Sequence, residues 1–218
     1  MKSEINFVKV SSTASGAGSK IPRGMQHPIF AWMGMRAPLA QHTRAEHEAL
    51  MKYAKNARTI VEIGVAEGAS AVGLHEAMPP EGTLYLVDPF HLSRLPVLNF
   101  EKRAAKRVVN AAGRARTVWI EEFSQDAVKT WKDPIDFLLI DGDHQEKAVE
   151  RDWREWSPFV GAGVVAFHDA RLFPGGWPSP DYGPVRFIDR IFRRSSEPPW
   201  NIIEEVDSLV FVSRGPRK

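Results

Sequence analysis

The sequence predicts an α/β domain built on a mostly parallel seven-stranded sheet with helices on both faces. Five short apolar runs rich in β-branched residues alternate with amphipathic helical patterns, as in parallel strands joined by crossover helices. Two more strand-like runs near the C-terminus are separated by a short turn and predict an antiparallel hairpin. The first run, residues 59–64, leads through two glycines into a helix, the outline of a site for an anionic ligand.

Length and composition indicate one compact domain, with 218 residues of which 43% are hydrophobic. The net charge is +2 and the basic clusters near the C-terminus lack interleaved aromatic residues, so no nucleic-acid partner is expected. The absence of cysteine excludes disulfides and thiolate metal sites. No apolar run approaches a membrane span, and the start is too polar for a signal peptide, so we expect a cytoplasmic protein without a membrane partner.

Residues 1–42 are predicted to form an N-terminal arm before a domain at 43–218. Residues 1–20 are rich in Ser, Gly and Ala and are expected to be disordered. Residues 21–41 combine three prolines with several large apolar side chains, so this part is expected to pack on the domain or on a neighbour, or to cover the active site. An exposed apolar arm is unusual in a monomer, which makes a homo-oligomer one alternative.

The elements follow from local patterns. Thr43 and Glu46 form a capping box that begins a helix reaching about Asn56, and the prolines at 79–80 end the helix that starts at Ala69. Further helices are expected at residues 97–112, from Ser124 to Trp131, after His144 and from Pro184 to Arg194. The strands are expected at residues 59–64, 83–87, 117–121, 135–140, 164–167, 201–205 and 209–213.

The second strand ends in Asp88, about 20 residues after Gly68, where nucleotide-binding βαβ units place a carboxylate on the ribose hydroxyls. Because Asp-Pro is a common turn pair, Asp88 as a turn or cap residue is the alternative. Phe90, just beyond it, is expected to flank an adenine ring.

Polar side chains also end the fourth and fifth strands. Asp141 and His144 follow the fourth, and His168 and Asp169 follow the fifth. Neighbouring parallel strands end at one edge, and two nearby carboxylates repel unless a positive charge lies between them, so a divalent cation is predicted here. The alternatives are that one acid is protonated or that Asp169 caps the next turn. Asp143 is expected to be the N-cap of the helix that follows, and a second carboxylate of the metal site is its alternative role.

The pattern Glu62-x-Gly64-x-x-x-Gly68 resembles motif I of the class I S-adenosylmethionine (SAM) methyltransferases. The resemblance implies a Rossmann-like fold in which the glycine turn approaches the methionine end of SAM and Glu62 lies near its amino group. Ser70, which follows the turn, is also expected to bind the cofactor. Ser124 and Gln125 match the stretch near the adenine amino group, although Ser124 suits a helix cap equally well.

The Asp141-Gly-Asp-His144 stretch with its His168-Asp169 partner resembles the small metal-dependent O-methyltransferases of natural-product pathways, including those acting on macrolide sugars. The resemblance implies Mg²⁺ or Mn²⁺ held by Asp141, His168 and Asp169, with His144 as general base. His168 stands where this branch usually has an acid, which is a departure at the third ligand. In methyltransferases without a metal, the acid at the position that Asp141 occupies here faces the transferring methyl group or orients the acceptor.

The expected function is therefore SAM-dependent methyl transfer to an oxygen of a small-molecule acceptor, assisted by a divalent cation. Two alternatives stay open. One is an enzyme of other chemistry on the same fold, and the other is a non-catalytic protein that assembles through its arm.

Overall fold

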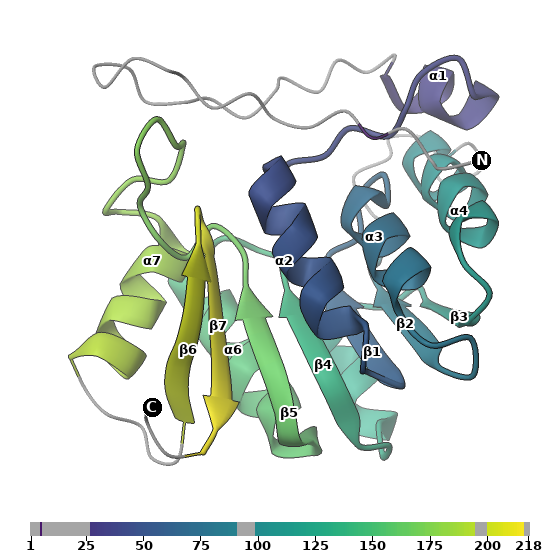
Figure 1. The fold of residues 1–218 in the computed structure, drawn as a ribbon. Helices are drawn as coiled ribbons and strands as arrows, with labels where there is room; N and C mark the ends of the chain where they lie inside the picture. The colour runs from purple at the N-terminus through teal and green to yellow at the C-terminus, as the bar shows by residue number, and fades with distance from the viewer. Residues whose placement is uncertain (1–4, 6–26, 91–98, 195–199, 216–218) are drawn as a thin grey trace.

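A computed structural model describes residues 5, 27–90, 99–194 and 200–215, and shows a sheet between two layers of helices (Figure 1). The strand order is β3-β2-β1-β4-β5-β7-β6, with parallel pairing from β3 through β5. β7 pairs antiparallel with both β5 and β6, as the predicted hairpin requires. The predicted fold class is confirmed.

The strands are β1 (Thr59–Ile63), β2 (Thr83–Val87), β3 (Arg116–Ile120), β4 (Ile135–Ile140), β5 (Val160–Phe167), β6 (Trp200–Val206) and β7 (Leu209–Arg214). The helices are α1 (His27–Met33), α2 (Arg44–Ala54), α3 (Ala69–Ala77), α4 (Phe100–Ala112), α5 (Ser124–Ala127), α6 (Glu146–Trp156) and α7 (Gly183–Ile188). A 3-10 turn follows α5 at Val128–Thr130 and another follows α6 at Ser157–Phe159, while a π-helical turn extends α7 at Asp189–Arg193.

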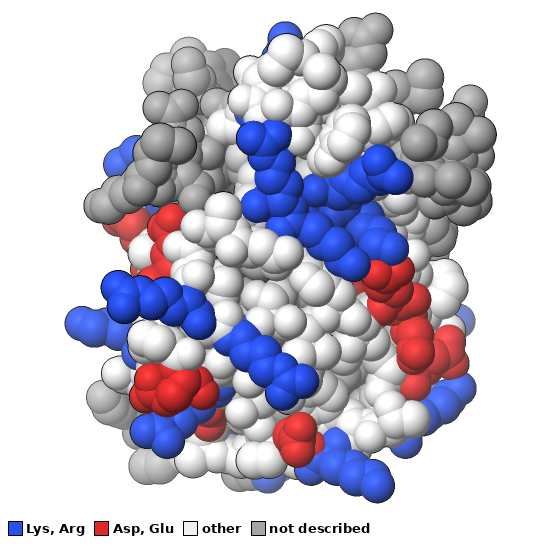
Figure 2. Space-filling model, turned by 90° about the vertical axis from the view of Figure 1, so that its right-hand side faces the viewer, with Lys and Arg blue, Asp and Glu red and all other residues white. Residues whose placement is uncertain are grey.

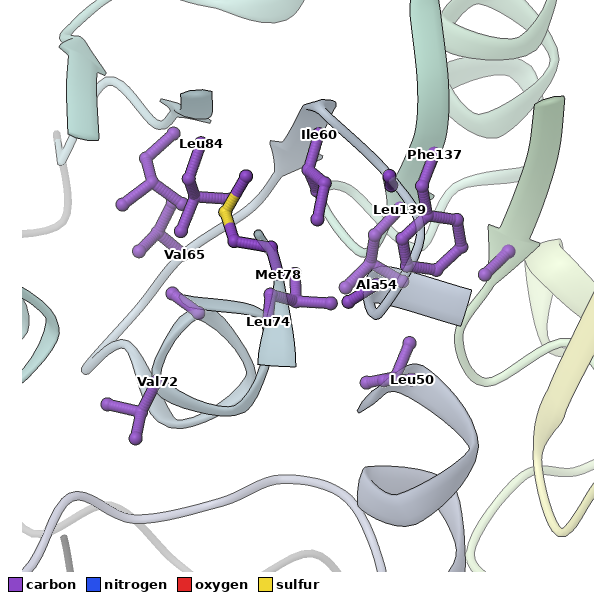
Figure 3. Close-up of a cluster of buried hydrophobic side chains, with 14 of the residues drawn as sticks. Leu50, Ala54, Ile60, Val65, Val72, Leu74, Met78, Leu84, Phe137 and Leu139 are labelled. Atoms are coloured by element: carbon purple, nitrogen blue, oxygen red, sulfur yellow. The ribbon is translucent and has the colours of Figure 1, made fainter. Parts of the chain in front are cut away.

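Alternate residues of each strand enter two separate cores. On the face covered by α2, α3 and α4, Ile60, Leu84 and Phe137 pack against side chains such as Leu50 and Leu74 (Figure 3). The other face carries the neighbouring strand residues and is covered by α6 and α7. Where the alternation is regular, as along β1 and β2, it fixes the register, because a slip by one residue would exchange the two faces. Register shifts interrupt it in β4 between Ile135 and Phe137 and in β6 between Ile202 and Glu204.

Three local predictions were wrong. β5 begins at Val160, because the glycine-containing stretch before the apolar run continues the strand. α6 has Gln145 as its N-cap, and Asp143 instead accepts a hydrogen bond from Gln145 N at 2.9 Å in the turn before the helix. α5 has Phe123 as its N-cap, so Ser124 is the first helical residue and not a cap.

The described part of the arm contains a helix, α1, that was not predicted. Trp32 of α1 lies against Phe100 of α4, with ring centroids 5.5 Å apart, and Arg103 stacks over the Trp32 ring. Residues 1–4 and 6–20, expected to be disordered, lie outside the described residues. Figure 2 shows the side of the molecule that carries α4, where Lys and Arg side chains gather. On α4, Lys102 and Lys106 pair with Glu121. Within the described ranges, no helix has the length and apolarity that a membrane crossing needs.

Candidate functional site

A cavity of about 890 Å³ opens at the carboxyl edge of the sheet, where β1, β2 and β4 end. Most of the residues predicted from the sequence share this cavity. Its lining includes Gly64, Ser70, Asp88, Phe90, Ser124, Gln125, Asp141 and His144. Residues Leu39, Gln41 and His42 of the arm close one wall, as expected for an arm that covers the site.

The glycine turn brings backbone rather than side chains to the cavity. Gly64 has φ +89°, and a Cβ there would overlap the carbonyl oxygen of Asp141, so β1 and β4 can end this close only with glycine. Gly68, with φ +83°, is the N-cap of α3 and offers no capping side chain. The first N–H groups of α3 therefore stay available to an anionic ligand group.

Asp88 holds this turn in place. Its Oδ2 accepts hydrogen bonds from Val65 N at 2.9 Å and Ala66 N at 3.1 Å, and its Oδ1 accepts one from Phe90 N at 2.7 Å. The turn role given above as the alternative is therefore present. It does not exclude ligand binding, since each carboxylate oxygen can accept a further hydrogen bond and Asp88 lines the cavity.

Glu62 lies behind the turn and is fully buried. Its Oε1 accepts a hydrogen bond from the Ser70 hydroxyl of α3, and burial raises the pKa of Glu62 to about 8, with Asp141 and Asp88 adding to the shift. Glu62 is not among the lining residues, so it supports the turn from below while Ser70 reaches the cavity.

The cavity lining also includes a carboxylate, Asp152, that was not predicted from the sequence. Asp152 of α6 is buried and accepts a hydrogen bond from the Ser124 hydroxyl at 2.6 Å. Burial raises the pKa of Asp152 to about 6. Its position on the inner face of an amphipathic helix, among the apolar residues Ala148, Val149 and Trp153, is the signal that could have identified it.

Asp141, His144 and His168 converge beside the glycine turn. One ligand atom from each lies within 4.8 Å of the other two, and this is a candidate metal group. His168 Nδ1 is 2.9 Å from Asp141 Oδ1, and His144 Nε2 is 3.8 Å from the same oxygen. The sequence predicted Asp141 and His168 in this group and gave His144 another role.

Asp169, the third predicted metal ligand, is not part of this group. It is fully buried with φ +55°, and its Oδ1 accepts a hydrogen bond from the Trp177 indole at 2.6 Å. Its Oδ2 lies 2.8 Å from His144 Nε2. Asp169 therefore faces both His144 and the loop at residues 170–182, and Trp177 anchors that loop.

His168 supplies a positive charge between the acids. Burial acts to lower the pKa of His168, but the carboxylates of Asp141 and Asp169 more than offset it and raise this pKa well above the usual value. An imidazolium here satisfies the requirement for a cation between two carboxylates. The Nδ1 atom of His168, which faces Asp141, can ligate a metal once it has lost its proton.

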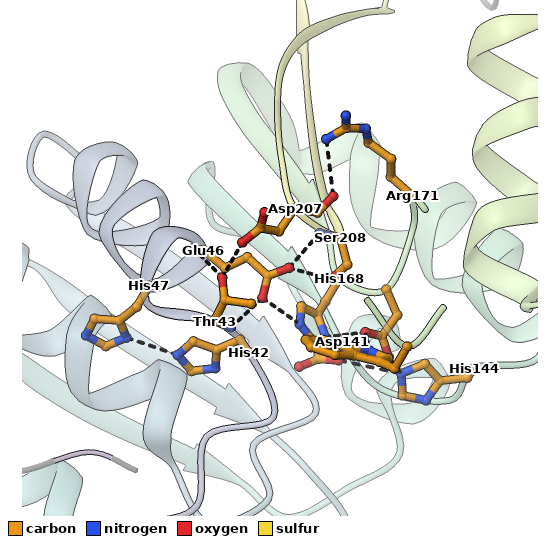
Figure 4. A network of polar contacts seen from close by, with 12 residues as sticks. His42, Thr43, Glu46, His47, Asp141, His144, His168, Arg171, Asp207 and Ser208 are labelled. Atoms are coloured by element: carbon orange, nitrogen blue, oxygen red, sulfur yellow. Dashed lines mark hydrogen bonds and ion pairs between the residues drawn. The ribbon is translucent and has the colours of Figure 1, made fainter. Parts of the chain in front are cut away.

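Two further side chains near His168 were not predicted as site residues (Figure 4). Glu46 was identified only as part of the capping box, yet its Oε2 lies 3.7 Å from His168 Nε2. His42 of the arm is buried and lines the cavity. His42 Nε2 lies 3.0 Å from His47 Nδ1, and burial lowers the pKa of His42 to about 3.

Comparisons with known proteins agree with this geometry. The profile of a family described as "Methyltransferase domain" matches residues 61–170, just over half of the chain. The O-methyltransferase TomG from Streptomyces achromogenes, involved in tomaymycin synthesis and solved with SAM, superposes with a TM-score of 0.60 at 18% identity over 87% of this chain and 88% of that one. An O-methyltransferase from Bacillus cereus in complex with SAH (S-adenosylhomocysteine) superposes with a TM-score of 0.57 at 16% identity, over 89% of this chain and 93% of that one. Cofactor-bound Rv0187 from MTB superposes with a TM-score of 0.61 at 16% identity, over 86% of this chain and 87% of that one.

Proposed function

This chain belongs to the methyltransferase-domain family, and from that premise we propose that it transfers the methyl group of SAM to an oxygen of a small-molecule acceptor, assisted by Mg²⁺ or Mn²⁺. The observation that carries the proposal is a cavity that joins the glycine turn and Asp88 to Asp141 and His144, two of the three residues of the candidate metal group. Its volume lies within the range of small-molecule sites.

The cofactor residues support SAM by their chemistry. SAM supplies a methyl group on a positively charged sulfur. The N–H groups at the start of α3 suit the carboxylate of its methionine part, and Asp88 offers oxygens to ribose hydroxyls. Phe90 is buried against Trp119, with ring centroids 6.2 Å apart, and gives the adenine ring an apolar neighbour. The O-methyltransferase neighbours, two of them solved with SAM or SAH, support the same cofactor.

The donor set fits a small divalent cation. Bond lengths of about 2.0–2.2 Å to a cation place neighbouring donors about 3–4 Å apart, as the 2.9 and 3.8 Å separations from Asp141 Oδ1 are. Imidazole nitrogens favour Mn²⁺ over Mg²⁺, which prefers oxygen ligands. When bound, the cation would lower the pKa of the acceptor hydroxyl.

His144 is the candidate general base. Its side chain is 38% exposed at the cavity wall, and Asp169 lies 2.8 Å from its Nε2. A buried carboxylate at one ring nitrogen orients the imidazole, which leaves Nδ1 for the acceptor proton. In this arrangement Asp141 and His168 hold the cation. If Nε2 of His144 binds the cation instead, that nitrogen cannot also be the base.

The direct test is formation of S-adenosylhomocysteine from SAM with a panel of phenols and sugar hydroxyls as acceptors. We expect turnover that falls in excess chelator and returns on addition of Mn²⁺ or Mg²⁺. Full activity in excess chelator would remove the cation from catalysis and leave Asp141 to orient the acceptor. Binding of SAM without turnover of any acceptor would favour the non-catalytic alternative.

We also propose that the arm contacts a second copy of this chain. Trp32, Met33 and Met35 are 37%, 53% and 57% exposed, an unusual group of large apolar side chains on a monomer surface. Light scattering should give a mass above that of one chain, and Met33→Glu with Met35→Glu should lower it. A wild-type mass equal to one chain would contradict this proposal.

A further inference from the structure

Glu46 joins three parts of the molecule that are distant in sequence (Figure 4). It lies in the first turn of α2 and is fully buried. Its Oε2 accepts a hydrogen bond from Thr43 N at 2.7 Å, which completes the capping box. Its Oε1 accepts two hydrogen bonds from Ser208 in the β6–β7 turn, from the backbone N at 2.7 Å and from the hydroxyl at 2.5 Å.

The contact of Glu46 with His168 goes beyond what a helix cap needs. Its Oε2 lies 3.7 Å from His168 Nε2, while the other ring nitrogen, Nδ1, faces Asp141. The His168 side chain is only 2% exposed, so solvent water has little access to the ring nitrogens and does not replace the carboxylates as their partners. A buried imidazole with a carboxylate at each nitrogen has its orientation fixed, and the carboxylate at one nitrogen determines which tautomer the other presents.

We propose that Glu46 is a positioning residue, whose carboxylate faces Nε2 of His168 as an ion-pair partner and so directs Nδ1 toward Asp141 and the candidate metal group. The inference rests on the proposed function for the cation, but the orientation of the ring can be measured without any cation. Glu46 lies outside residues 61–170, the part of the chain that the family profile matches.

Ser208 makes this arrangement rigid. The same residue that donates to Glu46 also accepts a hydrogen bond from Ala170 N at 2.8 Å through its carbonyl oxygen. Ala170 directly follows Asp169, so the end of β5, the β6–β7 turn and the start of α2 are fixed to one another. Thr43 adds a hydrogen bond from its hydroxyl to Asp207 Oδ2 at 2.6 Å. Glu46 is therefore held in place beside His168 by contacts from both α2 and the β6–β7 turn.

The test compares Glu46→Leu with wild type by two measurements. In metal-free protein, ¹⁵N NMR of the His168 imidazole should show a changed Nε2 environment. Calorimetric titration with Mn²⁺ should show affinity about 10–100-fold weaker, the usual effect of removing the carboxylate behind a metal-binding histidine. Glu46→Gln keeps one acceptor oxygen and should fall between wild type and Glu46→Leu in both measurements.

Glu204→Leu is the matched control, because it removes another carboxylate that joins α2 to the C-terminal hairpin, where it accepts hydrogen bonds from Lys52 and Tyr53 at 2.7 and 2.6 Å, and it leaves Glu46 facing His168. It should lower the melting temperature and leave the His168 spectrum and Mn²⁺ affinity unchanged. The inference is overturned if folded Glu46→Leu keeps the wild-type His168 spectrum, or, should that variant not fold, if Glu46→Gln cannot be distinguished from wild type. Wild-type protein that takes no Mn²⁺ would count against the proposed cation, whereas the imidazole spectrum still decides the role of Glu46.

Discussion

Asp88 shows how one carboxylate can shape a loop and remain available to a ligand. Replacing it with alanine leaves three backbone N–H groups of the turn region without their acceptor. We expect Asp88→Ala to weaken SAM binding by about 1–3 kcal/mol, measured by calorimetry. Asp136→Ala is a matched control, because Asp136 accepts hydrogen bonds from Arg58 N and Thr59 N at the opposite end of β1. It should lower stability and leave SAM affinity unchanged, and equal SAM affinities in both variants would contradict the ribose assignment.

His144 has two possible roles that one variant separates. A general base accelerates turnover about 10²–10⁴-fold, so His144→Ala should lose this factor in single-turnover rate while SAM and Mn²⁺ affinities stay close to wild type. If His144 is a ligand of the cation, His144→Ala should instead bind Mn²⁺ more weakly than wild type. A purely structural histidine would lower the melting temperature and spare the rate of the folded enzyme. Measuring the three quantities on the same preparation assigns the role.

At the scale of elements, Glu62 of β1 and Ser70 of α3 join the strand to the helix beneath the glycine turn. Because burial raises the pKa of Glu62 from 4.5 to about 8, the folded protein keeps this proton at pH values where the unfolded chain has lost it. The contribution of Glu62 to the free energy of unfolding therefore falls as pH rises from about 4.5 to about 8, by at most about 1.4 kcal/mol per pH unit.

Glu62→Gln tests this assignment, because the amide has a similar shape and cannot lose a proton. In urea unfolding at several pH values, the variant should gain stability relative to wild type as pH rises through that window. Glu81→Gln is a suitable control, since Glu81 is 59% exposed and pairs with Arg58 at 3.8 Å on the surface. Parallel pH curves for wild type and Glu62→Gln would show that Glu62 is ionised in the folded protein.

At the scale of the whole molecule, cofactor binding should stabilise the entire fold. The cavity is built from β1, β2, β4, α6 and the arm, so it exists only when these parts are assembled. SAM at 100 times its dissociation constant should add about 2.7 kcal/mol to the free energy of unfolding. Thermal melts should therefore shift upward with SAM and S-adenosylhomocysteine concentration, and NAD should leave them unchanged. A shift with NAD of the same size would contradict the predicted cofactor.

The sequence by itself determined the sheet, most helices and the glycine turn. These features depend on local signals, namely apolar runs, the capping box at Thr43, the proline pair at 79–80 and the spacing of Gly64 and Gly68. Hydrophobic patterns and backbone preferences act over a few residues, so they can be identified without knowing the fold. The strand ends at Asp141 and Asp169 were placed at one edge by topology alone, since parallel strands end together.

The tertiary structure alone decided which side chains face one another. His144 lies in the candidate metal group, Asp169 accepts a hydrogen bond from Trp177, and Ser124 contacts Asp152 rather than capping a helix. Glu46 carried a clear helix-cap signature that concealed its contact with His168, more than a hundred residues away in sequence. A local pattern sets the path of the backbone, whereas burial removes water as a partner, so each buried charge takes the partners that distant elements place beside it.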